Sequence, residues 1–221
     1  MQTTMENLTK AETYYDKFSR VYDIFSPDWY YRKPRKQAIK ALKLELGQSV
    51  LNLPCGTGQN FKYLQHYLQD SGRIIGVDLS SGMLDKARKK VAANNWSNAI
   101  LIKGEATAVN PDWIADKLGE QVAFDAVLCD LGLSGFPEWQ NIIDNLLSVL
   151  RPGGIIVIMD WYIEKPGLRA KFIKWIGGGE VDRPLYQYLA EKADGFLLND
   201  SFKGGDVFVA SGTKKSEASP V

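Results

Sequence analysis

Apolar residues in the middle of the chain follow two alternating patterns: short continuous runs and helical repeats. The short β-branched runs predict five strands, and apolar residues three or four positions apart predict helices between them. The expected strands cover Ser49–Leu53, Arg73–Asp78, Ala99–Lys103, Phe124–Cys129 and Ile155–Asp160. The expected helices cover Gln59–Gln69, Ser80–Ala93 and Pro137–Leu150.

This alternation predicts right-handed crossovers and a parallel sheet with helices on both faces. Two further runs, Phe196–Phe202 and Val207–Ser211, are separated only by Lys203, Gly204 and Gly205. Such a short, glycine-rich link predicts an antiparallel hairpin at one edge of the sheet. The fold class is therefore α/β, with a doubly wound, mostly parallel seven-stranded sheet that ends in an antiparallel hairpin.

Two aromatic-rich stretches lie outside the alternating pattern, at residues 14–31 and 161–190. In open α/β sheets, ligands bind outside the carboxyl ends of the strands, and both stretches can fold over that crevice. We therefore expect a single domain over residues 1–212, with an N-terminal helical lid (1–46) and a helical insertion (161–194). The polar residues 213–221 predict a flexible tail.

The strongest local signal is the run VLNLPCGTG at residues 50–58, with Asp78 twenty residues after Gly58. Glycines at the end of a first strand let a ligand approach the backbone, and the next helix offers unpaired N–H groups. A carboxylate at the end of the second strand can accept hydrogen bonds from a ribose diol. The pattern predicts an adenosine-type ligand, although a tight turn without any ligand explains the glycines alone.

The glycine loop departs from the two common nucleotide-binding fingerprints. A dinucleotide site has a third glycine where this chain has Phe61, and no phosphate-binding P-loop motif is present in the sequence. A ligand without phosphates is therefore favoured over a nicotinamide dinucleotide.

Five motifs in order resemble the class I S-adenosylmethionine-dependent methyltransferases, especially the ubiquinone/menaquinone C-methyltransferase and phospholipid N-methyltransferase type. They are VLNLPCGTG, GVDLSSGML, LIKGEA, FDAVLCDLGLSGFPEW and VLRPGG. The resemblance runs from about Tyr14 to Gly212. It implies a Rossmann-like fold, S-adenosyl-L-methionine as cofactor and a small-molecule or lipid-like methyl acceptor.

The resemblance also implies which residues hold the cofactor. The loop glycines pass under its methionine part, Asp78 takes the ribose diol, and the residue that ends the fourth strand meets its amino group through the backbone. The residues implied are Asn52, Cys55, Gly56, Thr57, Gly58, Asp78, Leu79, Met83, Glu105, Ala106 and Cys129. Asn52 stands where the family usually has Asp or Glu, so it keeps an acceptor oxygen but lacks the charge. Pro54 stands where a glycine is usual.

Candidates for the chemistry itself are fewer. Tyr15 and Tyr22 can shelter a cation with their ring faces, or they can form a helix-packing surface. Asp130 and Asp160 end neighbouring strands and can take a proton, although an aspartate there is more often a cap or loop anchor. His66 lies off the apolar face of its helix, which indicates a surface residue.

Composition narrows the remaining classes. The 221 residues are 45% hydrophobic and 24% charged with a net charge of +1, so no basic excess favours nucleic acid as a partner. No apolar run approaches the roughly 18 residues of a membrane-spanning helix, and the polar N-terminus predicts no signal peptide. Two cysteines predict no disulfide scaffold and a cytoplasmic, reducing compartment, and a single histidine argues against a metal site.

Basic residues interleaved with aromatics leave peripheral membrane contact open. Such segments can rest on anionic lipid, although a solvated face is the simpler interpretation. The basic residues are Lys33, Arg35, Lys36, Lys40 and Lys43 after the first aromatic stretch, and Arg169, Lys171 and Lys174 within the second. Two other functions also stay open. The first is a non-catalytic S-adenosylmethionine-binding protein, and the second, disfavoured by Phe61, is a nicotinamide dehydrogenase.

Overall fold

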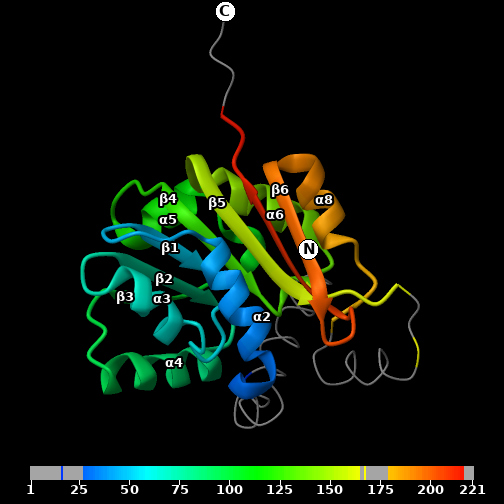
Figure 1. Cartoon of the computed structure of the whole chain (residues 1–221). Coiled ribbons are helices and arrows are strands. Elements are labelled where there is room, and N and C mark those ends of the chain that lie inside the picture. The colour runs from blue at the N-terminus through cyan, green and yellow to red at the C-terminus, as the bar shows by residue number, and fades with distance from the viewer. Residues whose placement is uncertain (1–15, 17–26, 165–166, 168–178, 217–221) are drawn as a thin grey trace, which may run out of the picture.

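A seven-stranded sheet organises the computed structural model, which describes residues 16, 27–164, 167 and 179–216 (Figure 1). Its strand order is β3-β2-β1-β4-β5-β7-β6. Strands β1 to β5 pair in parallel, whereas β7 runs antiparallel to both β5 and β6. The strands are β1 (Ser49–Asn52), β2 (Arg73–Asp78), β3 (Ala99–Lys103), β4 (Phe124–Asp130), β5 (Leu150–Trp161), β6 (Asp194–Phe202) and β7 (Val207–Thr213). The fold class predicted from the sequence is confirmed.

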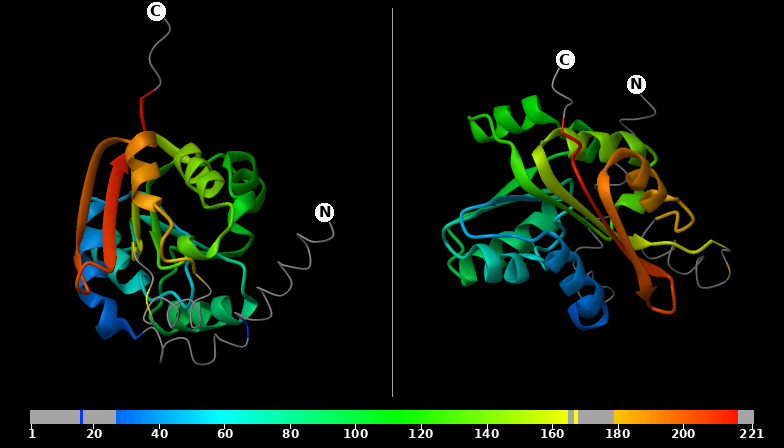
Figure 2. Two further views of the ribbon diagram at one scale, coloured as in Figure 1. Left: turned by 90° about the vertical axis from the view of Figure 1, so that its right-hand side faces the viewer. Right: turned by 45° about the horizontal axis from the view of Figure 1, so that its top comes forward.

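Helices cover both faces of this sheet (Figures 1 and 2). One face carries α2 (Asp28–Ala41), α3 (Phe61–Leu68) and α4 (Ser81–Ala93), and the other carries α5 (Pro111–Leu118), α6 (Trp139–Ser148) and α8 (Leu185–Lys192). Two short 3₁₀ turns, η1 (Ala106–Ala108) and η2 (Leu133–Gly135), follow β3 and β4. Successive strand residues alternate between the two cores, as Val50 and Leu51 do, because side chains along a strand point to opposite faces.

Helix α5 is an element that the hydrophobic pattern did not reveal, although its ends carry clear signals. The Asn110 side chain accepts a hydrogen bond from the backbone N–H of Trp113, and Pro111 occupies the first turn. Gly119 closes the helix in the left-handed conformation. Capping chemistry at both ends therefore defines a helix that is too short for a strong apolar period.

Several boundaries in the carboxyl-terminal half differ from the predicted ones: α6 is shorter than the helix predicted over Pro137–Leu150, and strands β5, β6 and β7 are longer than predicted. Strand β5 begins at Leu150, which pairs with Phe124 across a register shift, so β5 also includes residues 151–154, which lie between the predicted helix and the predicted strand. At the predicted tail, Thr213 pairs with Ile155 as the last residue of β7. Lys214 donates through its backbone N–H to the Gly154 carbonyl at 2.8 Å. These bonds join segments distant in sequence, so no local pattern announces them.

The predicted N-terminal lid falls partly within the described residues. Helix α2 packs its Ala38 and Ile39 against Val157 of β5 and Val209 of β7, so this part of the segment belongs to the helical layer on the sheet. Residues 1–15 and 17–26 lie outside the described residues, as do 165–166 and 168–178 of the predicted insertion. The described end of that insertion contains α8.

Candidate functional site

The glycine loop leaves the carboxyl end of β1 and turns directly into α3. Gly56 and Gly58 have φ angles of +53° and +73°, which side chains with a Cβ rarely adopt. A Cβ at Gly58 would also lie 3.2 Å from the Phe61 ring and 3.3 Å from the Ala87 side chain. Phe61, at the position of the third glycine of a dinucleotide site, therefore packs against the loop and leaves no free space for a side chain at Gly58.

Asp78 at the end of β2 is tied to this loop. One carboxylate oxygen accepts from the Gly56 backbone N–H at 2.8 Å, and the other accepts from the Ser80 N–H at 2.9 Å. Burial raises the pKa of the Asp78 carboxyl, and backbone hydrogen bonds from Ser80, Gly56 and Leu79 offset part of that rise. The carboxylate keeps further lone pairs with which it can accept hydrogen bonds from a diol.

Beside Asp78, the predicted adenine side is formed by three other segments. Leu79 and Met83 lie at the end of β2 and at the start of α4, and Met83 is buried. Glu105 follows β3, and Lys103 of β3 pairs with Asp78 in the sheet. The Glu105 carboxylate accepts a hydrogen bond from Thr107 Oγ1 at 2.6 Å. The structure thus brings these segments to one edge of the sheet, with Ala106 buried behind them.

Helix α4 has two capping side chains, and only one of them was visible in the sequence. Ser80 accepts from the Met83 backbone N–H, as its position before the helix predicts. Asp16, distant in sequence, accepts from Ser80 Oγ at 2.6 Å and from the Gly82 N–H at 2.9 Å. The hydrogen bond from the Ser80 hydroxyl holds the pKa of Asp16 below its usual range, and the bond from the Gly82 N–H makes the next largest contribution.

Asn52 is fully buried, and its polar atoms form hydrogen bonds with other buried groups of the protein. Its Nδ2 donates to the Leu128 carbonyl at 3.2 Å, and its Oδ1 accepts from Asn60 Nδ2 at 3.2 Å. This chain of amides fixes the orientation of both side chains, because each amide nitrogen must face a carbonyl-type acceptor. Asn52 thus joins β1, β4 and the start of α3.

Arg35 on α2 is buried at the carboxyl end of β4, so it does not belong to the solvated or lipid-facing basic residues with which the sequence grouped it. Its Nε donates to Asp130 Oδ2 at 3.0 Å, and its Nη1 donates to Gln59 Oε1 at 2.9 Å. Nη1 also donates to Asp28 Oδ1 at 3.1 Å, and Asp28 is held in turn by Lys62 and Tyr63 of α3. One guanidinium therefore connects α2, the end of β4 and the residue that follows the glycine loop.

Asp160 ends its strand as an anchor for the turn after β4. Its oxygens accept from the backbone N–H of Ser134 at 3.0 Å, from Ser134 Oγ at 2.9 Å and from the Trp161 N–H at 2.8 Å. Burial raises the pKa of this carboxyl, although those hydrogen bonds oppose the rise. The geometry matches the loop anchor that was the alternative to catalysis.

The two cysteines behave as buried neutral side chains. Burial raises the pKa of the Cys55 thiol well above its ordinary value, and the neighbouring Asp78 carboxylate adds to the rise. Burial likewise raises the pKa of Cys129, with further contributions from Asp160 and Asp130. A thiolate nucleophile at either position is therefore disfavoured.

Charge at this edge is unbalanced. Among the residues that the structure describes, the buried charged side chains are Arg35, Asp78, Asp130 and Asp160. Three carboxylates thus accompany one guanidinium, and each lies at or against the carboxyl end of a strand. Such an environment favours a ligand that carries positive charge. Tyr15 and Tyr22, the aromatic candidates for this role, lie outside the described residues.

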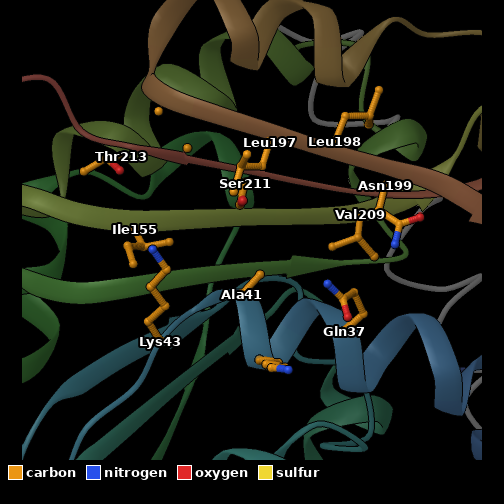
Figure 3. A pocket seen from close by; sticks show the side chains of 13 residues that line it. Gln37, Ala41, Lys43, Ile155, Leu197, Leu198, Asn199, Val209, Ser211 and Thr213 are labelled. Carbon is orange, nitrogen blue, oxygen red and sulfur yellow. The ribbon is translucent and has the colours of Figure 1, made fainter.

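A separate groove of about 280 Å³ lies between α2 and the β6–β7 hairpin. Figure 3 shows Gln37, Ala41 and Lys43 on one side of it, across from Val209 and Ser211 of β7. Its other lining residues include Lys40, Leu197 and Leu198. The groove lies away from the glycine loop, and none of the described helices is long and apolar enough to cross a membrane.

Comparison with known proteins shows which family and which proteins this chain resembles. Residues 50–154 match the family described as a methyltransferase domain. Over 126 residues the chain is 32% identical to demethylmenaquinone methyltransferase of Shouchella clausii, an alignment that spans 57% of this chain and 50% of that protein. With demethylmenaquinone methyltransferase of Oceanobacillus iheyensis it is 26% identical over 215 residues, which span 93% of this chain and 86% of that protein.

A solved structure shares the fold. The S-adenosylmethionine-dependent methyltransferase from Aquifex aeolicus superimposes with a TM-score of 0.61 at 16% identity, over 89% of this chain and 98% of that one. The matched domain contains the glycine loop, Asp78 and the ends of β3 and β4. Residues 50–154 thus match a methyltransferase domain, the chain is similar to menaquinone-type methyltransferases, and the solved structure shows the shared fold. Together these findings support an S-adenosylmethionine-dependent methyltransferase.

Proposed function

We propose that this chain transfers a methyl group from S-adenosyl-L-methionine to a small, lipid-like acceptor of the quinone class. The observation that carries the proposal is the bond between the Gly56 N–H and Asp78, which unites the glycine loop and the diol-accepting carboxylate in one structure. The names of the two relatives support a quinone-type acceptor. The net negative character of the buried edge supports a cationic cofactor.

The cofactor would lie along the carboxyl ends of β3, β2, β1 and β4, in that order. Asp78 would accept from the ribose hydroxyls, with Leu79, Met83, Glu105 and Ala106 around the adenine. The backbone of residues 55–58 would pass beneath the middle of the cofactor, where Gly56 and Gly58 leave room for close approach. The methionine part would then reach the end of β4 at Cys129, beside Asn52.

S-adenosylmethionine supplies a methyl group on a sulfonium, which transfers by in-line displacement. The residues of the chain have to align the acceptor, exclude water and stabilise the positive charge before transfer. Alignment alone can lower a barrier by about 7–11 kcal/mol. Tyr15 and Tyr22 stay our predicted cation-sheltering residues. Because both Asp160 oxygens accept hydrogen bonds from Ser134 and Trp161, we assign Asp160 to positioning the turn after β4.

Ligand binding tests the proposal first. Because a specific ligand stabilises the folded state in proportion to the logarithm of its concentration over Kd, S-adenosylhomocysteine should raise the melting temperature and NAD should not. Transfer of labelled methyl to a panel of demethylated quinones and phenols then tests the acceptor. Binding without turnover on any acceptor would favour the alternative, a non-catalytic S-adenosylmethionine-binding protein, and stabilisation by NAD alone would contradict the cofactor.

We further propose peripheral contact with anionic lipid at the groove between α2 and β6–β7. Lys40 and Lys43 line it together with apolar side chains, and Leu197 of β6 is 65% exposed, so the groove offers both positive charge and apolar surface. Flotation with vesicles that contain anionic lipid should carry the protein upward, and neutral vesicles should not. A K40E/K43E variant that floats as well as the natural chain would contradict this contact.

A further inference from the structure

Two buried acceptor atoms near the glycine loop have no hydrogen-bond partner among the described residues. They are Asn60 Oδ1, at the start of α3, and Asp130 Oδ1, at the end of β4. A buried acceptor without a donor loses its hydration without compensation, so such atoms are uncommon in folded proteins. When they occur at the binding edge of a sheet, a donor group on the ligand is a direct explanation.

Arg35 joins the positions of these two acceptors. Its Nε binds Asp130 Oδ2, and its Nη1 binds Gln59, the residue before Asn60. Both Arg35 and Asp130 have side chains that are 4% exposed, so this pair is shielded from solvent. The guanidinium fixes one oxygen of Asp130 and leaves the other without a donor, which orients the carboxylate instead of saturating it.

Asn52 cannot provide the charge that an ammonium ligand requires. Its side chain is neutral, and both of its polar atoms bind inside the protein, to Leu128 and Asn60. Asp130 lies two residues beyond Leu128 on the same strand, at the end where the methionine part of the cofactor would arrive. A carboxylate that keeps one oxygen unpaired is well suited to a primary ammonium, which has three donors.

We propose that Asp130, oriented by Arg35, binds the ammonium group of the cofactor's methionine part. This inference rests on the proposed function, because it requires S-adenosylmethionine or its product at this edge. Asp130 then acts as a cofactor-recognition residue that compensates for the neutral Asn52.

Two ligands that differ at one end test this assignment. S-adenosylhomocysteine carries the amino-acid group, whereas methylthioadenosine has the same nucleoside but lacks it. Titration calorimetry of D130N should show S-adenosylhomocysteine weakened by roughly 10- to 100-fold, the range expected for a lost charge-assisted hydrogen bond, and methylthioadenosine unchanged. R35K, which keeps the charge but loses the fixed fork, should weaken S-adenosylhomocysteine alone as well, and it serves if D130N does not fold.

The matched control is Asp125, at the opposite end of the same strand. It pairs with Arg151 at 2.7 Å and accepts from the Ser49 N–H, so D125N removes a comparable carboxylate far from the cofactor edge. D125N should bind both ligands as the natural chain does. Equal weakening of both ligands in D130N, or no weakening of S-adenosylhomocysteine, would overturn the role of Asp130. Failure of the natural chain to bind either ligand would instead overturn the proposed function itself, and this inference with it.

Discussion

The ends of β1 and β2 and the ends of β4 and β5 both hold buried carboxylates, but they hold them by different means. Asp78 is fixed by the backbone N–H groups of Gly56 and Ser80. Asp130 is fixed by the Arg35 side chain, 95 residues away in the sequence. We call the ends of β1 and β2 the first edge and the ends of β4 and β5 the second edge. The first edge is built from the loops that follow two adjacent strands, whereas the second edge depends on a helix from another part of the chain. The difference predicts that the nucleoside end and the amino-acid end of the cofactor respond to separate mutations.

The largest expected effect is that of D78A on the nucleoside end. Removal of this carboxylate deletes the acceptor for the ribose hydroxyls and leaves the Gly56 N–H without its partner. We expect Kd to rise by about 100-fold, or ~2.7 kcal/mol, for both S-adenosylhomocysteine and methylthioadenosine by calorimetry. A loss confined to S-adenosylhomocysteine would erase the contrast between the two edges. A melting curve establishes that the variant is folded.

Removal of the Asp160 side chain tests whether this residue stabilises the fold or contributes to cofactor binding. D160A leaves the backbone N–H groups of Ser134 and Trp161 buried without an acceptor. The free energy of unfolding should fall by about 2 kcal/mol in urea denaturation, with the Kd of S-adenosylhomocysteine changed less than threefold. S134A, which removes only the hydroxyl bond, should cost about 1 kcal/mol. A D160A variant with full stability and no binding would instead place Asp160 in the site.

Two glycines with the same φ angle test how much the loop depends on close packing. Gly58 and Gly119 both have φ of +73°, but a Cβ at Gly58 meets Phe61 and Ala87 while one at Gly119 meets nothing within 4 Å. G119A should cost about 1 kcal/mol of stability from the left-handed conformation alone. G58A should cost about 2 kcal/mol, because crowding is added, and should also weaken S-adenosylhomocysteine. Equal costs would show that the loop tolerates a side chain.

The smallest expected effect is that of pH on the first edge. The pKa of Asp78 is raised above its ordinary value of 3.8 chiefly by burial, so acid protonates it earlier than an exposed aspartate. Because a protonated carboxyl accepts fewer hydrogen bonds, affinity for methylthioadenosine should fall severalfold as pH drops through the pKa of Asp78. A D78N variant should give a flat profile over the same range. An affinity that rises in acid would contradict the role of Asp78.

Protonation of Asp78 should also change the free energy of unfolding, and it should raise stability whereas it lowers affinity. A carboxyl whose pKa is higher in the folded state than in the unfolded state binds its proton more tightly when folded. The ionised Asp78 therefore costs stability at neutral pH, and this cost is relieved as pH falls through its folded-state pKa. Asp125 has the reverse sign: burial raises its pKa, but bonds from Ser49 and Arg151 outweigh burial and lower it, so its contribution is lost in acid. Thermal melts of D78N and D125N against pH separate the two.

The first edge was predictable because its parts are close in sequence or follow adjacent strands. Gly56 and Gly58 were predicted from the turn they must form, and their φ angles confirm that conformation. Asp78 was placed by its position at the end of a strand, and the structure brings it to the loop. The roles of the cofactor-binding residues stay predictions until a ligand is measured.

The second edge was not predictable in the same way. Arg35 was read from the sequence as one of several basic residues after an aromatic stretch, yet it is 3% exposed and pairs with Asp130. No local pattern distinguishes a buried arginine from its solvated neighbours, because its partners come from α3 and β4. Asp16, which caps the start of α4 from a distant part of the chain, could not be recognised for the same reason.

The succession of strands along the chain, their parallel or antiparallel type, the glycine loop and the adenosine-type ligand followed from the sequence by itself. Each depends on hydrophobic period, backbone freedom or strand-end position, which act over a few residues. Only the tertiary structure decided that Asn52 is occupied, that Asp160 anchors a turn and that Asp130 keeps an oxygen unpaired beside Arg35. These facts depend on which side chains meet when distant segments pack, and burial then determines which of their polar atoms lack a partner.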